Sequence, residues 1–129
     1  MAPSSKAESI LNQINSKTKL GGLRKIAKEI KKDHSLAMEL WSTGIFLARQ
    51  LEILIMDIRM ISQDLVNKLD QDMHAHSVNE RNQLTDWLMA NQLTKDKKTI
   101  ALIELWENSA SSLQRRVFWY YQARLRWIG

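Results

Sequence analysis

Residues 114–127, QRRVFWYYQARLRW, hold four arginines and five aromatic residues in fourteen positions. Guanidinium groups bind phosphates and aromatic rings stack on bases or sugars, so this composition is typical of a nucleic-acid surface. One side of a helix over this segment carries Arg115, Trp119, Gln122 and Arg126, at spacings of four, three and four. The alternative is a core helix in which Trp119 packs on a neighbouring helix while the arginines extend into water.

Two histidines, His74 and His76, follow Asp70 and Asp72, and all four side chains are of types that ligate metals. A spacing of two does not place both imidazoles on one face of a helix. We therefore expect exposed histidines in a connection between helices, and no metal site. The sequence has no glycine-rich phosphate loop, and no cofactor is expected.

The elements that would position these residues are expected to be helices throughout, because strand-like alternation of β-branched residues is absent from the sequence. Helix starts are indicated by Asp33, by Ser62 and by the capping-box patterns at Ser5–Glu8, Ser77–Glu80 and Ser111–Gln114. Gly21-Gly22 is expected to be a turn. The expected helices span 5–16, 23–32, 34–41, 44–58, 62–73, 78–92, 95–107 and 112–128. The last should pack through Val117, Tyr121 and Leu125.

The length of 129 residues predicts a single domain spanning 1–129, and connections between the expected helices are short enough for antiparallel neighbours. No apolar run approaches the length of a membrane span, so no membrane partner is expected. Cysteine is absent, which favours a cytoplasmic location.

Charge is unevenly distributed along the chain. Residues 1–32 carry eight Lys or Arg and two acids, residues 33–94 carry four and nine, and residues 95–129 carry seven and three. The regional charges are therefore +6, −5 and +4. Two basic ends would form an anion-binding surface if they share a face, and otherwise an unevenly charged solvated surface.

Residues 23–30 read LRKIAKEI, and residues 33–44 read DHSLAMELWSTG. This stretch, continued by Ile45, Ala48-Arg49 and Leu51, resembles the DNA alkylation repair family, which consists of bacterial DNA glycosylases. The likeness covers most of the chain and is strongest over 23–58. It implies a HEAT-like solenoid of antiparallel helix pairs with a basic concave face that grips duplex DNA. It also implies hydrolysis of the N-glycosidic bond of alkylated purines.

The chain departs from the family at the position of its chemistry. The family has an aromatic residue and a carboxylate one turn apart in a segment like SWDxxDQL, and the matching residues here are Ser77–Leu84. Val78 occupies the tryptophan position and Asn82 the aspartate position, so charge stabilisation of the transition state is lost there. The nearest substitutes are Asp86 and Glu80, although a capping-box Glu80 should point back to Ser77.

The resemblance favours a protein that binds duplex DNA non-specifically and whose glycosylase chemistry is weakened or lost. Arg116 matches the arginine with which the family holds phosphate. The expected DNA-binding residues are Arg24, Lys25, Lys28, Arg115, Arg116, Trp119 and Arg126. Two alternatives stay open, namely a helical-repeat module that binds a protein, and an active glycosylase with a rearranged site.

The chain is shorter than the family pattern and stops after the last expected helix. A helical-repeat stack that ends without a cap exposes an apolar flank. We therefore expect either a piece of a longer protein or a homo-oligomer in which a second copy covers the flank, with Phe118 and Trp127 at that contact.

Overall fold

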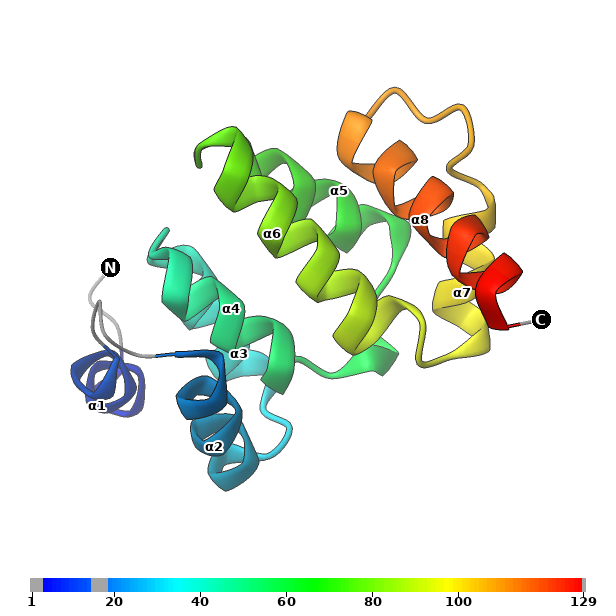
Figure 1. The fold of residues 1–129 in the computed structure, drawn as a ribbon. Coiled ribbons are helices and arrows are strands. Elements are labelled where there is room, and N and C mark those ends of the chain that lie inside the picture. Colours follow the sequence, from blue (N-terminus) through cyan, green and yellow to red (C-terminus); the bar gives the residue numbers. More distant parts are fainter. Residues whose placement is uncertain (1–3, 15–18, 129) are drawn as a thin grey trace. The chain divides into compact units, whose positions relative to one another are not determined.

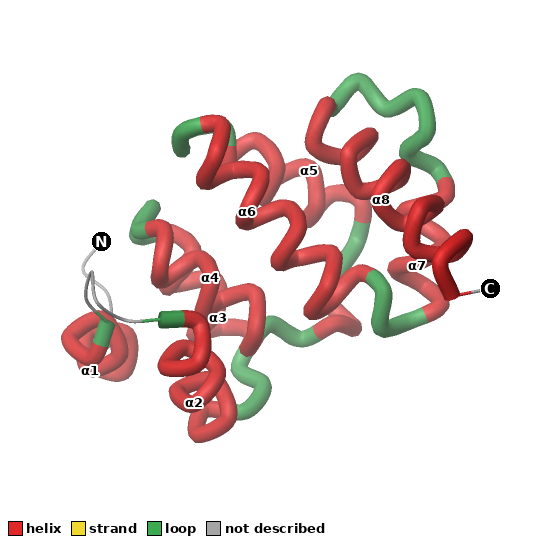
Figure 2. The backbone as a smooth tube through the Cα atoms, viewed as in Figure 1, coloured by secondary structure: helices red, strands yellow, loops and turns green. Residues whose placement is uncertain are grey.

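The computed structural model of the chain describes residues 4–14 and 19–128, and that part consists of helices joined by loops, without strands (Figures 1 and 2). Its α-helices are α1 (Ser5–Gln13), α2 (Leu20–Ile30), α3 (His34–Ser42), α4 (Phe46–Ile55), α5 (Gln63–Met73), α6 (Val78–Leu88), α7 (Lys97–Glu104) and α8 (Ser112–Ile128). A 3₁₀ turn, η1 (Ile58–Met60), and a π-helical turn, η2 (Met89–Leu93), complete the set. The all-α expectation is confirmed, and no helix among the described residues is long and apolar enough to cross a membrane.

Helix starts follow the expected capping chemistry in most places. The side chains of Asp33, Ser62 and Ser77 accept the backbone N–H groups of Leu36, Leu65 and Glu80 at 3.1–3.2 Å. Ser4, not Ser5, caps α1, and Asp96 caps α7 by accepting the N–H of Lys98 at 3.0 Å. A short polar side chain thus satisfies an otherwise unpaired N–H group at each of these ends. The helices expected from 23 and from 44 begin instead at Leu20 and Phe46, without a side-chain cap.

The expected turn at Gly21-Gly22 is wrong, because both glycines lie inside α2. Glycine in a helix costs about 1 kcal/mol relative to alanine, but this pair occupies only the first turn. The same helix buries Leu23 completely. Tertiary packing therefore outweighs the local preference. Helix α1 ends at Gln13, and the expected helical residues 15–16 lie outside the described part of the chain.

The chain divides into two compact units, residues 1–60 and residues 61–129. In the N-terminal unit α4 packs against α2 and α3, and α1 packs against α3. Its core includes many of the residues that carry the family resemblance, and is formed by Ala7, Ile10, Leu23, Leu36, Ala37, Leu40, Trp41, Ala48, Leu51, Ile53, Ile55 and Met56.

In the C-terminal unit α5 and α6 lie side by side (Figure 1), α6 also contacts α8 and η2, and α7 contacts α8 and η2. The core side chains are Ile61, Val66, Leu69, Met73, Leu84, Leu88, Leu93, Ile103, Trp106, Leu113, Val117 and Phe118. The expected packing of α8 is correct for Val117, which is 3% exposed, but wrong for Leu125, which is 40% exposed. Tyr121 is half-buried.

The core of the N-terminal unit contains a buried ionisable pair of residues on α4. The guanidinium of Arg49 lies 4.5 Å from the centre of the Trp41 ring, and its Nε donates to the Trp41 carbonyl at 3.0 Å. Glu52 is fully buried, and neither of its carboxyl oxygens accepts a hydrogen bond from the described residues. Burial raises the pKa of Glu52 well above its ordinary value, and the nearby charge of Arg49 only partly opposes this.

Replacing Glu52 should remove a loss of folding stability that grows as the pH rises. Because the folded state holds the Glu52 proton more tightly than the unfolded chain, stability should fall as pH rises above the unfolded pKa of 4.5. Glu52→Gln should therefore raise the free energy of unfolding at pH 8 by about 1 kcal/mol or more, with little change near pH 4. Urea unfolding across that pH range measures this effect. The exposed Glu29→Gln is the control, and parallel pH curves for wild type and Glu52→Gln would contradict the assignment.

Candidate nucleic-acid interface

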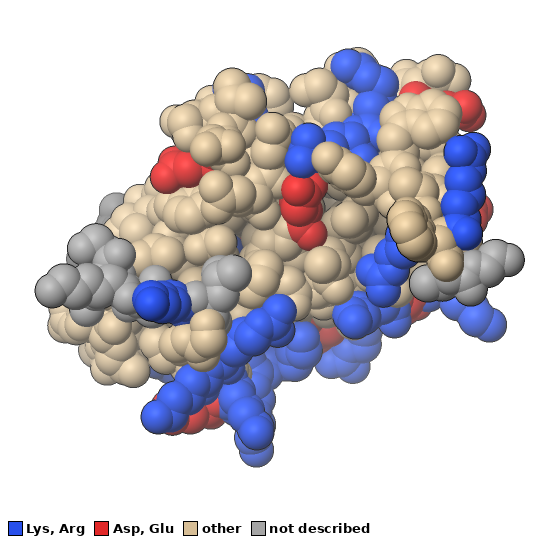
Figure 3. All heavy atoms as spheres, in the orientation of Figure 1, with Lys and Arg blue, Asp and Glu red and all other residues tan. Residues whose placement is uncertain are grey.

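An open hollow of about 390 Å³ on the N-terminal unit is surrounded by cations. It is lined by Arg24, Ala27, Lys28, Lys31, Lys32 and Leu54. We call this surface the basic hollow. In Figure 3, Lys and Arg side chains gather over the part of the molecule where Figure 1 places α2. The described lining includes four basic side chains and no carboxylate, which gives the hollow a positive potential.

The geometry of α2 creates this cluster. Arg24, Lys28 and Lys31 are spaced by four and three residues, so they project from one side near the C-terminal end of the helix. The partial negative charge at a helix C-terminus favours cations there. Lys31 ends the helix with a positive φ of 66°, and Lys32 donates its Nζ to the Leu54 carbonyl at 3.4 Å. The side chain of Lys32 thus reaches across to α4 and closes one edge of the hollow.

The sequence predicted part of this surface. Arg24 and Lys28 were expected to bind DNA, and the structure brings them together in the lining of the hollow. Lys25 is exposed on the same helix but is not part of the lining. Lys31 and Lys32 belong to the same basic run of the sequence but were not among the expected DNA-binding residues, although the expected helix over 23–32 included both.

On the C-terminal unit, Arg116 does not present an unoccupied guanidinium. Its Nε and Nη2 donate to the two carboxylate oxygens of Asp86, both at 2.9 Å, and the guanidinium lies 4.6 Å from the centre of the Tyr120 ring. The hydrogen bonds to Asp86 raise the pKa of Arg116 above its ordinary value, as do the charge of Asp86 and the Tyr120 contact. The planar fork that would hold a phosphate therefore holds a carboxylate, and Asp86 is engaged as well.

The other expected residues of α8 divide into two groups. Arg115 donates to the carbonyl of Ser109, at the connection that leads into the helix. Trp119 is 54% exposed, and Arg126 is exposed near the end of the helix. Trp127, expected at a contact with a second copy of the chain, is 89% exposed. Phe118, expected at the same contact, is instead buried in the core of this unit.

The segment expected to correspond to the catalytic motif of the DNA alkylation repair family holds no aromatic–carboxylate pair. Val78 is the first residue of α6 and is 62% exposed, and Asn82 is half-buried. The expectation that Glu80 points back to Ser77 is wrong. Its carboxylate lies 3.1 Å from Nδ1 of His76, whereas the Ser77 hydroxyl accepts the backbone N–H of Glu80.

That contact also corrects the expectation for the two histidines. The His74 side chain is 47% exposed, but the His76 side chain is only 8% exposed. The pairing with Glu80 and the packing at the start of α6 enclose the His76 imidazole. Among the described residues, no group of three or more His, Asp or Glu side chains lies together as metal ligands would.

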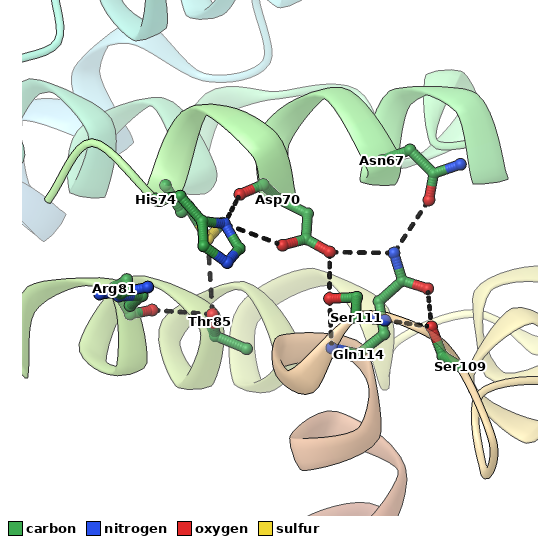
Figure 4. A network of polar contacts seen from close by, with 9 residues as sticks. Asn67, Asp70, His74, Arg81, Thr85, Ser109, Ser111 and Gln114 are labelled. Carbon is green, nitrogen blue, oxygen red and sulfur yellow. Dashed lines mark hydrogen bonds and ion pairs between the residues drawn. The ribbon is translucent and has the colours of Figure 1, made fainter. Parts of the chain in front are cut away.

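A polar network that the sequence did not indicate joins α5 to the first turn of α8 (Figure 4). Ser111 donates its hydroxyl to the Asp70 carboxylate, and Gln114 donates its Nε2 to Asp70 at 3.1 Å and to Asn67 at 2.9 Å. Ser109 donates to the Gln114 side-chain oxygen at 3.0 Å. The network borders an open hollow of about 630 Å³. His74 lies on the far side of Asp70 from Ser111 (Figure 4), so these three residues do not form a Ser–His–Asp relay.

The network should contribute measurably to stability, because Gln114 is 7% exposed and satisfies several partners at once. Gln114→Ala would leave the oxygens of Asn67 and Asp70 with fewer donors, which should lower the free energy of unfolding by about 2–3 kcal/mol. Gln71→Ala, at an exposed residue lining the same hollow, should change it by about 0.5 kcal/mol or less. Urea unfolding of both variants is the measurement. Equal losses would mean that the network is not buried as described.

No protein-family model matches the chain, and no curated protein or solved structure matches it. The resemblance to the DNA alkylation repair family therefore remains an expectation from sequence. Function is inferred from the geometry of this chain's own residues.

Proposed function

We propose that the chain binds duplex DNA without sequence preference, and that the basic hollow of α2 supplies the main phosphate contacts. The observation that carries this proposal is the lining itself, in which Arg24, Lys28, Lys31 and Lys32 surround one hollow. Cations held this close together repel one another, and a phosphate bound between them relieves that repulsion. An open hollow suits a backbone that passes over the surface better than a small ligand that must be enclosed.

The sequence resemblance supports the same proposal from a different direction. The segment LRKIAKEI contributes Leu23 to the core and Arg24 and Lys28 to the basic hollow. A DNA alkylation repair-like origin accounts for both roles. The fold would then be an arrangement of HEAT-like helix pairs, in which such basic residues line the surface that meets DNA.

The proposal includes a weakened or absent glycosylase reaction. Val78 and Asn82 offer neither an aromatic ring nor a charge at the expected positions. Asp86 is engaged by Arg116, and Glu80 lies against His76. Losing one charged contributor to a transition state typically costs about 3–4 kcal/mol, or two to three powers of ten in rate.

The alternative function is protein binding by a helical module, and the exposed rings of α8 favour it. Trp119, Tyr120 and Trp127 are 54%, 46% and 89% exposed. Aromatic residues are enriched at protein interfaces. This alternative predicts that DNA binding is absent at low salt.

Duplex binding can be tested by fluorescence anisotropy over a salt series. We expect a micromolar dissociation constant at low salt, because non-specific binding typically lies between about 10⁻⁴ and 10⁻⁶ M. Lys28→Ala combined with Lys31→Ala should weaken binding about tenfold and reduce the salt slope by about 2.

The matched control combines Lys97→Ala with Lys98→Ala, which removes the same charge from exposed residues of α7. This control should have a smaller effect. Arg116→Ala should also have a small effect, because Asp86 already occupies Arg116. Equal losses in the two double variants would show that only net charge matters and would remove the basic hollow from the proposal.

A base-release assay on methylated duplex DNA tests the catalytic half of the proposal. We expect release at or near the spontaneous rate, since the charged group at the family position is replaced by Asn82. Any residual release should fall in Glu80→Gln or Asp86→Asn, the two nearest carboxylates. Rapid turnover that survives both substitutions would mean that the reaction, if enzymatic, uses other residues.

A further inference from the structure

The exposed side of α8 carries two tryptophans with large accessible surfaces, although the Trp119 ring also packs edge-on against Phe118, with ring centres 5.1 Å apart. The helix is anchored by Leu113, Val117 and Phe118, which are 5%, 3% and 8% exposed. Trp119 and Trp127 lie on its other side with more than half of their surface in water. Large aromatic side chains gain most from burial, so two exposed indoles on one anchored helix indicate a surface for a ligand.

The spacing of these rings leaves room for a planar group. Trp119, Ala123 and Trp127 follow one another at intervals of four residues, so they form one row along the helix. The two tryptophans are about 12 Å apart along the helix axis, at 1.5 Å per residue. The small side chain of Ala123 lies between them, and an open hollow of about 370 Å³ is lined by Ala123, Arg126 and Trp127. A flat ring could rest on the Trp127 indole above Ala123.

The charged residues near this row of side chains favour an anionic ligand. Residues 108–129 contain four arginines and no aspartate or glutamate. Arg116 is compensated by Asp86, whereas Arg124 and Arg126 are exposed in the last two turns beside Trp127. The ligand must therefore combine flat rings with negative charge at regular intervals. Unpaired nucleotides have both properties, and the bases of an intact duplex do not offer their faces.

The arrangement of rings and charges distinguishes this surface from a membrane-binding helix. Membrane-surface helices separate an apolar face from a charged face. In α8 the apolar residues Leu113, Val117 and Phe118 are buried in the protein, and Leu125 is 40% exposed. On the exposed side, Arg126 lies about 20° from Trp119 around the helix and next to Trp127 in the chain, so rings and guanidinium groups alternate. Alternation suits a strand that presents bases and phosphates in turn.

We propose that the row formed by Trp119, Ala123 and Trp127, with Arg124 and Arg126, binds unpaired nucleic acid by stacking bases on the two indoles. This extends the proposed DNA binding to a second surface, on a different unit and for a different form of the ligand.

The test compares an oligothymidylate of about a dozen nucleotides with an abasic oligomer of equal length and with a duplex, all by fluorescence anisotropy. Wild type should bind the oligothymidylate at least about tenfold more tightly than the abasic oligomer, because stacking adds to phosphate attraction. Trp119→Leu combined with Trp127→Leu should remove that difference while changing duplex binding less than about twofold. Trp119→Phe combined with Trp127→Phe should restore most of it, because the rings remain.

A second readout separates stacking from a structural effect. Adding oligothymidylate should quench the tryptophan fluorescence of wild type, and Trp127→Phe should lose much of the quenching while keeping binding. Leu105→Ala, at a residue 74% exposed on another element, is the control for loss of apolar surface. The proposals for the two surfaces can be contradicted independently. Lys28→Ala with Lys31→Ala should weaken duplex binding without removing the preference for the oligothymidylate over the abasic oligomer.

Several outcomes would overturn the proposal. Equal binding of the oligothymidylate and the abasic oligomer would mean that phosphate attraction accounts for all of the binding and that bases do not stack on the row. Binding to phosphatidylserine vesicles that the Trp119→Leu, Trp127→Leu variant abolishes, without any preference for bases, would assign the row to a lipid surface. Sedimentation that shows a dimer lost in the same variant would assign it to a second copy of the chain.

Discussion

The position of α8 depends on one buried carboxylate. Asp70, on α5, accepts hydrogen bonds from Ser111 and Gln114 at the start of α8, and it is 8% exposed. Hydrogen bonds to a buried carboxylate offset part of the cost of its desolvation, so the donors of Ser111 and Gln114, which both reach Oδ2 of Asp70, couple this residue to the first turn of α8. The apolar contacts of Leu113 and Val117 then hold the rest of the helix against the unit. With that side of the helix fixed, Trp119 and Trp127 remain on the outside.

The two basic regions differ in how many positive charges surround one place on the surface. Arg116 is held by Asp86 in a two-point ion pair, and its charge is partly neutralised. In the basic hollow, four cations share a lining that contains no carboxylate among the described residues. A long-range field attracts an anionic polymer to any basic surface. The four cations around the hollow of α2 concentrate that field at one place, whereas Asp86 partly neutralises the charge of Arg116.

The two proposed surfaces use different physics. Phosphate attraction at the basic hollow is long-range, weakened by salt and indifferent to base identity. Stacking at α8 acts only in contact and requires bases that are not paired. Each surface belongs to its own compact unit. One can therefore be changed without disturbing the packing that forms the other.

The sequence by itself determined the helical class, several capped starts such as Asp33, Ser62 and Ser77, and the location of the basic segments. These features follow from interactions between residues close in the chain, namely side chain to backbone at a cap and neighbouring side chains along a helix. Only the tertiary structure decided which charges are engaged. The pairing of Arg116 with Asp86 spans 30 residues, and that of Gln114 with Asp70 spans 44. Helix periodicity carries no information about partners so far apart. The burial of Glu52 and the inclusion of Gly21 in α2 were also decided by packing, because a core contact outweighs a local preference of about 1 kcal/mol.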